Sequence, residues 1–152
     1  PADRIDNESI VSGIDLLPTL CGLTGVPLPD NFQGDGEDAS AALLGEDWER
    51  TDPLYWEWRF GFFGEPFHHS PELAIREGDW KLLLNPDGSR LELYNIPEDP
   101  TELTNLAAQH PDLVEKMEKE ALHWQATLPD GPVSPLAGKQ YYPYPEGFQD
   151  ED

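Results

Sequence analysis

Residues 73–84 read LAIREGDWKLLL, and residues 93–106 read LYNIPEDPTELTNL. In the first stretch, two apolar runs flank the triplet Glu77-Gly78-Asp79, a pattern that is typical of a β-hairpin. The Pro-Asp-Gly triplet at 86–88 predicts a turn, because proline presets φ and glycine accepts a positive φ. Residues 91–96 then predict the next strand. The region therefore predicts antiparallel strands that are joined by tight turns.

A further strand and a helix flank this region. From Pro53 onward, side chains alternate with a period of two, which predicts a half-buried strand with an aromatic inner face. Residues 111–128 predict a helix, because Pro111 suits its first position and apolar residues recur at helical spacing. We expect an α+β fold in which this helix covers a small antiparallel sheet of about four strands. The inner face of the strand is assigned to Leu54, Trp56, Trp58 and Phe60, and the helix stripe to Val114, Met117, Ala121, Trp124 and Leu128.

The N-terminal third predicts helices. Asp15 is the expected N-cap of a helix over residues 12–25, and Gly25 suits the position after its end. Leucines at 16, 20 and 23 recur at helical spacing. A second, short helix is expected over residues 38–44.

The chain is strongly acidic. It has 31 acidic residues against nine Lys and Arg, for a formal net charge of −22. Nucleic acid and anionic membranes are therefore not expected as partners, since both require a basic face. No apolar run approaches 18 residues, so we expect no membrane insertion. Residues 51–90 are the least acidic part, with seven acids and four bases, and this is the part expected to face any anionic substrate.

The order and spacing of these motifs, together with IDLLPTL at residues 14–20, resemble the C-terminal portion of a sulfatase. The resemblance is to the arylsulfatase and N-acetylgalactosamine-6-sulfatase type within the alkaline phosphatase superfamily, over roughly residues 9–127. It implies that residues 1–50 are the end of a catalytic α/β domain, to which the first helix belongs, and a linker. It also implies a sheet-plus-helix subdomain over 51–128, followed by a Pro- and Tyr-rich tail over 129–152.

The resemblance further implies a parent enzyme that hydrolyses sulfate esters, of carbohydrate in particular, with a formylglycine nucleophile and a calcium ion. Formylglycine is made from the Cys or Ser of a Cys/Ser-x-Pro-x-Arg motif. Cys21 is followed by Gly, Leu, Thr and Gly and does not match it. We therefore expect no catalytic residue, metal ligand or cofactor in this chain, and assign calcium and formylglycine to the upstream domain.

Four residues are candidates for the rim of a substrate pocket: Trp56, Arg59, His68 and His69. An aromatic face can stack on a sugar or aryl ring, and Arg or His can bind a second sulfate or a carboxylate. The alternative is that these are core aromatics and ordinary surface bases. The chain is expected to pack on its own upstream catalytic domain and to meet a sulfated small molecule or glycan only through that parent.

Two other functions stay open from the sequence. The chain could be a stand-alone acidic binding module that uses residues 55–69. It could also be the same subdomain of a related hydrolase that acts on phosphate or phosphonate esters. The acidity and the resemblance favour a periplasmic or extracellular parent protein.

Overall fold

The computed structural model describes residues 5–59 and 70–131 and divides the chain into two compact units, Pro1–Asp52 and Pro53–Asp152. The first unit contains the helices α1 (Leu16–Thr24) and α2 (Ser40–Leu44). The second contains four strands and the helix α3 (Pro111–Gln125). Within the described residues, no helix is both long enough and apolar enough to cross a membrane.

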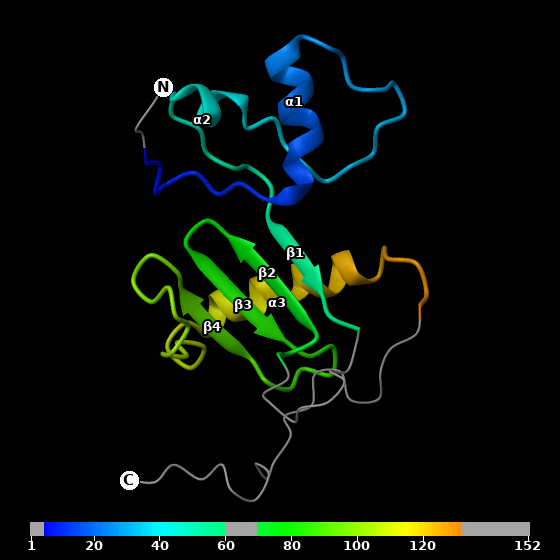
Figure 1. The fold of residues 1–152 in the computed structure, drawn as a ribbon. Helices are drawn as coiled ribbons and strands as arrows, with labels where there is room; N and C mark the ends of the chain where they lie inside the picture. Colours follow the sequence, from blue (N-terminus) through cyan, green and yellow to red (C-terminus); the bar gives the residue numbers. More distant parts are fainter. Residues whose placement is uncertain (1–4, 60–69, 132–152) are drawn as a thin grey trace, which may run out of the picture. The chain divides into compact units, whose positions relative to one another are not determined.

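The second unit is built on a four-stranded antiparallel sheet (Figure 1). The strands are β1 (Leu54–Glu57), β2 (Leu73–Glu77), β3 (Trp80–Leu84) and β4 (Glu92–Asn95), and they pair in chain order. Only two residues join β2 to β3, and Gly78 there has φ +54°. An L side chain adopts this backbone conformation at a cost, so the turn favours glycine. The α+β fold predicted from the sequence is confirmed.

The helix α3 (Pro111–Gln125) covers one face of this sheet. It begins at Pro111, as predicted, because the missing N–H of proline costs nothing in the first turn. It ends three residues before the predicted end, where the hydroxyl of Thr127 donates to the carbonyl of Trp124. The core is formed by alternate residues of three strands and by the stripe of the helix: Leu73, Ile75, Leu82, Leu84, Leu93, Val114, Met117 and Ala121.

The predicted inner face of β1 is wrong at its tryptophans: Leu54 is buried, at 4% exposed, but Trp56 and Trp58 line the face that α3 does not cover. Tyr55 lies opposite Ile75 and its ring stacks on Trp124 of α3, with centroids 5.1 Å apart. Trp56, one residue further on, is 43% exposed, and Trp58 is 42% exposed. An alternating pattern defines two faces of a strand but not which face is covered, and the register with β2 decides this. Phe60 lies outside the described residues.

In the first unit, a single 3-10 turn, Gly13–Asp15, leads into α1 (Leu16–Thr24), and α2 (Ser40–Leu44) follows after a loop. The helix α1 ends at Gly25 in the left-handed conformation, as predicted. Asp15 occupies the N-cap position, but its side chain does not cap α1. The carboxylate instead accepts hydrogen bonds from the backbone N–H of Ser12 and from Arg50.

Met117 gives a direct test of the core. Its side chain is fully buried between α3 and the sheet, so Met117→Ala leaves a cavity and should lower the free energy of unfolding by about 2–5 kcal/mol. Urea unfolding followed by circular dichroism measures the change. Glu115→Ala, on the exposed side of the same helix, is the matched control and should change the free energy of unfolding far less, because solvent screens its pair with Lys119. Equal effects of the two substitutions would contradict this packing.

Candidate functional site

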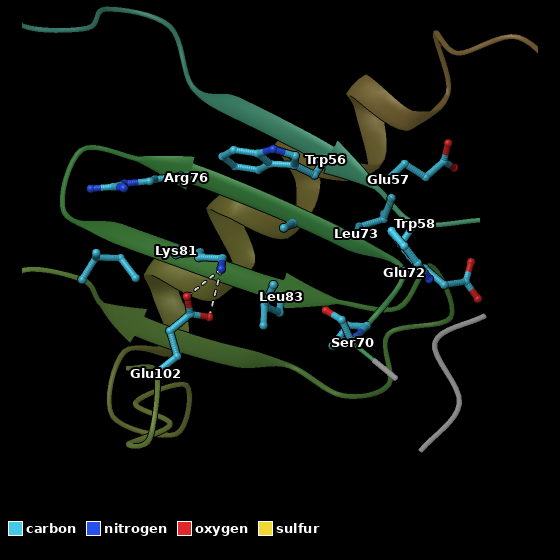
Figure 2. Close-up of a pocket in the computed structure, with 13 residues that line it drawn as sticks. Trp56, Glu57, Trp58, Ser70, Glu72, Leu73, Arg76, Lys81, Leu83 and Glu102 are labelled. Carbon is cyan, nitrogen blue, oxygen red and sulfur yellow. Dashed lines mark hydrogen bonds and ion pairs between the residues drawn. The ribbon is translucent and has the colours of Figure 1, made fainter. Parts of the chain in front are cut away.

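The face of the sheet that α3 does not cover contains a hollow of about 430 Å³ (Figure 2). We call it the sheet hollow. It lies over the outward-facing positions of β1, β2 and β3. Its lining residues are Trp56, Glu57, Trp58, Ser70, Pro71, Glu72, Leu73, Ala74, Arg76, Lys81, Leu83, Ile96 and Glu102.

Two tryptophans form the β1 side of the sheet hollow. Trp56 lies opposite Ala74 in the sheet, so no large side chain of β2 covers the base of its ring. The backbone N–H of Trp58 donates to the carbonyl of Glu72 at 2.7 Å, which continues the ladder past the end of β1. Both indoles are therefore held by regular backbone pairing while more than 40% of each residue remains exposed. Such rings can stack on a flat apolar surface of a ligand or of another domain.

Charged side chains of β2, β3 and the segment after β4 also line the sheet hollow. The ammonium of Lys81 donates to both carboxylate oxygens of Glu102, at 2.7 and 2.9 Å, as Figure 2 shows. Glu102 is held at φ +57°, a conformation that is unusual for a residue with a side chain. Nε of Arg76 donates to the carbonyl of Gly78. The two cations are thus fixed by the protein itself, and Lys81 is neutralised by its pair.

Glu72 is the carboxyl group of this site whose ionisation is disfavoured. Burial raises the pKa of Glu72, and the charges of Asp87 and Glu57 raise it further. A group of this kind holds a proton at a higher pH than a free glutamate does. Additional negative charge is therefore disfavoured next to Glu72 in the sheet hollow.

Arg59 lines a second hollow, of about 320 Å³, on the side of α3. Its guanidinium pairs with the carboxylate of Glu57 and donates to the carbonyl of Pro129 at 3.1 Å. The same carboxylate accepts a hydrogen bond from Gln125 of α3 at 3.0 Å. Arg59 thus ties β1 to the segment that follows α3, and the structure does not bring it together with Trp56. The side chain of Glu57 is only 10% exposed.

His68 and His69 lie outside the described residues. Among the residues that the structure describes, no three or more His, Cys, Asp or Glu side chains gather where they could hold a metal ion. Sequence reasoning missed the second tryptophan, the Lys81–Glu102 pair and Glu72 as members of one hollow. The available signal was the pairing register: once Tyr55 is placed toward α3, the residues on either side of it must face the other way.

The chain matches the family model described as N-sulphoglucosamine sulphohydrolase, C-terminal, over residues 2–127. It is 27% identical over 115 residues to arylsulfatase K of Bos taurus, covering 74% of this chain and 21% of the relative. It is 28% identical over 142 residues to the choline-sulfatase of Rhizobium meliloti (strain 1021), covering 88% of this chain and 26% of the relative. A solved 2-O GAG sulfatase, BT1596, shares the fold with a TM-score of 0.51 and 26% identity, covering 78% of this chain and 27% of that one.

These matches define the class as a sulfatase C-terminal domain. The chain belongs to the family of N-sulphoglucosamine sulphohydrolase C-terminal domains. It spans about a quarter of the length of the relatives that it matches. The resemblance found in the sequence is confirmed.

The raised pKa of Glu72 predicts a pH-dependent effect on stability. The folded pKa lies above the unfolded one, so the contribution of Glu72 to stability is fully present below the unfolded pKa and is lost as pH rises through the folded pKa. Glu72→Gln should therefore stabilise the chain at pH 7, by up to about 0.5 kcal/mol, and the gain should vanish by about pH 4. Urea unfolding at both pH values measures this. Glu98→Gln makes the same change at an exposed position and is the control for the substitution itself. A loss of stability at pH 7 in Glu72→Gln would contradict the effect of burial on Glu72.

Proposed function

We propose that this chain is the C-terminal part of an enzyme that hydrolyses sulfate esters of carbohydrates. The observation that carries the proposal is the family match over residues 2–127, and the fold agrees with it. The named activity of the 2-O GAG sulfatase supports a glycan as the sulfated partner. An exported parent protein, periplasmic or extracellular, is part of the same proposal.

The chain's own role in this proposal is structural support and the shaping of the substrate pocket. The resemblance assigns formylglycine and calcium to the upstream portion of the parent, where they would supply the nucleophile and neutralise sulfate charge. The described residues do not provide an oxygen-rich cluster of the kind that calcium requires.

We assign the pocket rim to the tryptophan side of the sheet hollow. Trp56 is the best placed of the predicted rim residues, because it is exposed, held by strand pairing and next to Trp58. Arg59 would act by positioning, since its guanidinium is bound to Glu57 and to the carbonyl of Pro129. His68 and His69 remain rim candidates on the sequence argument alone.

We also propose that α1 packs on the upstream catalytic portion of the same polypeptide. The helix and the 3-10 turn before it expose a row of large apolar side chains, each 40–61% accessible: Ile14 of the turn, and Leu16, Leu17, Leu20 and Leu23 of α1. A row of this kind on a folded unit marks a surface that another element covers. The chain spans about a quarter of its relatives, so the upstream three quarters of the parent are the occupant to which we commit.

The parent enzyme provides the first test. The complete parent should release sulfate from an aryl sulfate and from sulfated saccharides, and the isolated chain should release none. Trp56→Ala in the parent should raise KM for the saccharides roughly 2- to 12-fold, since ring stacking contributes about 0.5–1.5 kcal/mol.

Trp56→Phe keeps an aromatic face and is the control for that variant, with KM near the wild-type value. A parent that hydrolyses phosphate esters in preference to sulfate esters would contradict the proposed activity. An unchanged KM in Trp56→Ala would remove Trp56 from the rim.

The docking of α1 predicts different effects of one substitution in two settings. In the isolated chain, Leu20→Ser changes an exposed side chain and should alter the free energy of unfolding by about 0.5 kcal/mol or less. In the parent the same leucine would be buried, so the loss should reach about 1.5–3 kcal/mol. Thermal unfolding of both proteins measures the difference. Sedimentation should show a monomeric isolated chain; a dimer that Leu20→Ser dissociates would assign the row to a second copy instead.

A further inference from the structure

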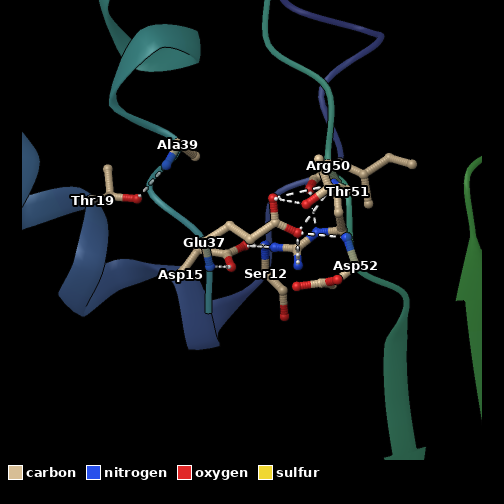
Figure 3. Close-up of polar contacts among 9 residues, drawn as sticks. Ser12, Asp15, Thr19, Glu37, Ala39, Arg50, Thr51 and Asp52 are labelled. Carbon is tan, nitrogen blue, oxygen red and sulfur yellow. Dashed lines mark hydrogen bonds and ion pairs between the residues drawn. The ribbon is translucent and has the colours of Figure 1, made fainter. Parts of the chain in front are cut away.

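A buried carboxylate stands at the start of α1. The side chain of Asp15 is fully buried, in a chain whose acidic residues are otherwise mostly exposed. It accepts hydrogen bonds from the backbone N–H groups of Ser12 at 2.7 Å and Glu37 at 2.9 Å, and it forms an ion pair with Arg50 (Figure 3). A charge in this position is tolerated because each of these donors compensates for the water that it has lost.

Glu37 forms the second half of the arrangement. Its carboxylate accepts from the backbone N–H of Asp52 at 2.8 Å, from the backbone N–H of Thr51 at 3.1 Å and from the hydroxyl of Thr51 at 3.1 Å. It also accepts from the guanidinium of Arg50 at 3.3 Å. Its side chain is 18% exposed. The carboxylate thus holds the last residues of the first unit against the loop that precedes α2.

Arg50 joins the two carboxylates. Its side chain is only 5% exposed, and its guanidinium contacts Asp15, Glu37 and, through Nε at 3.1 Å, the carbonyl of Ile10. The planar fork of arginine can serve these three acceptors at once, which the single ammonium of lysine does less well. One side chain therefore links three segments that are far apart in the sequence.

The backbone next to Asp15 and Glu37 is also closely packed. A Cβ atom at Gly36 would clash with the backbone carbonyl of Ile14, so the loop reaches the start of α1 without an intervening side chain. Further along the helix, the hydroxyl of Thr19 accepts from the backbone N–H of Ala39 at 3.0 Å, and both residues are buried. One side of α1 is thus held by polar contacts, and the apolar row remains uncovered.

We infer that Asp15, Glu37 and Arg50 form a polar lock that fixes α1 within the isolated first unit. Its apolar row is then a preformed docking surface, not a segment that folds only on docking. Arg50 is the positioning residue of this surface, because its guanidinium contacts both carboxylates. The inference deepens the proposed packing of α1 on the upstream portion and rests on it for the identity of the occupant.

The electrostatics agree with this geometry. Burial raises the pKa of Asp15, but the Arg50 guanidinium and the N–H donors outweigh it, and the net shift is downward. Burial likewise opposes the N–H groups of Asp52 and Thr51 at Glu37, whose pKa is also lowered. For lowered carboxyl pKa values, the stabilisation is present above the unfolded values of 3.8 and 4.5 and is lost as pH falls through the folded ones. Among the described residues, the charged group that acts on both carboxylates is the guanidinium of Arg50.

Amide hydrogen exchange on the 152-residue chain tests the lock. In the wild-type chain, the amides of residues 20–24 should be protected. Arg50→Met keeps the bulk of the side chain but removes the cation from the buried carboxylate of Asp15 and the partly buried carboxylate of Glu37, so these amides should exchange about tenfold faster or more. The amides of β2, β3 and α3 should not change. Arg76→Met, in the second unit, is the matched control and should leave residues 20–24 unaffected.

A second measurement uses pH and does not depend on the folding of a variant. Protection of residues 20–24 in the wild-type chain, corrected for intrinsic exchange, should fall as pH is lowered below about 4, while the second unit keeps its protection. Unprotected amides in the wild-type chain at neutral pH would overturn the lock but leave the proposed enzyme intact, because a helix that folds on docking serves it equally well. Protection that survives both Arg50→Met and low pH would also overturn the lock.

Discussion

The packing of α3 against one face of the sheet is the constraint on which the rest of the second unit depends. The stripe that contains Met117 buries alternate residues of the strands, and the period of two then assigns every neighbouring residue to the other face. The stack of Tyr55 on Trp124 extends this rule to β1, the edge strand. As a consequence, Trp56 and Trp58 are displayed on the uncovered face, beside the sheet hollow. The packing of α3 on one face of the sheet thus produces both the core and the surface that we propose as a rim.

The acidic chain uses Arg and Lys side chains to form ion pairs with its own carboxylates. Arg50, Arg59 and Lys81 are each bound to a carboxylate within their own unit. With nine Lys and Arg against 31 acidic residues, pairs of this kind consume cations that could otherwise meet an anionic substrate. The chain is therefore better suited to offer aromatic and apolar surface than a sulfate-binding charge. This agrees with the proposal that the chain shapes the substrate pocket and supplies no catalytic residue.

The sequence predicted the elements of the fold well and the residues of the site less well. The hairpin around Gly78, the start of α3 at Pro111 and the family followed from local patterns, because turn chemistry and periodicity are local. The faces of β1 did not, since only the pairing of Tyr55 with Ile75 shows which side is covered. The role of Asp15 was also missed: a capping pattern is visible in sequence, but an ion pair with a residue 35 positions away is not.

We propose that this chain completes a sulfatase whose catalytic residues lie upstream. Reading the coding DNA immediately before Pro1 tests this directly. We expect a continuous reading frame that encodes a Cys/Ser-x-Pro-x-Arg motif and the paired acidic residues of a calcium site. A frame that continues upstream through a complete domain without that motif, or a stop codon directly before Pro1, would contradict it.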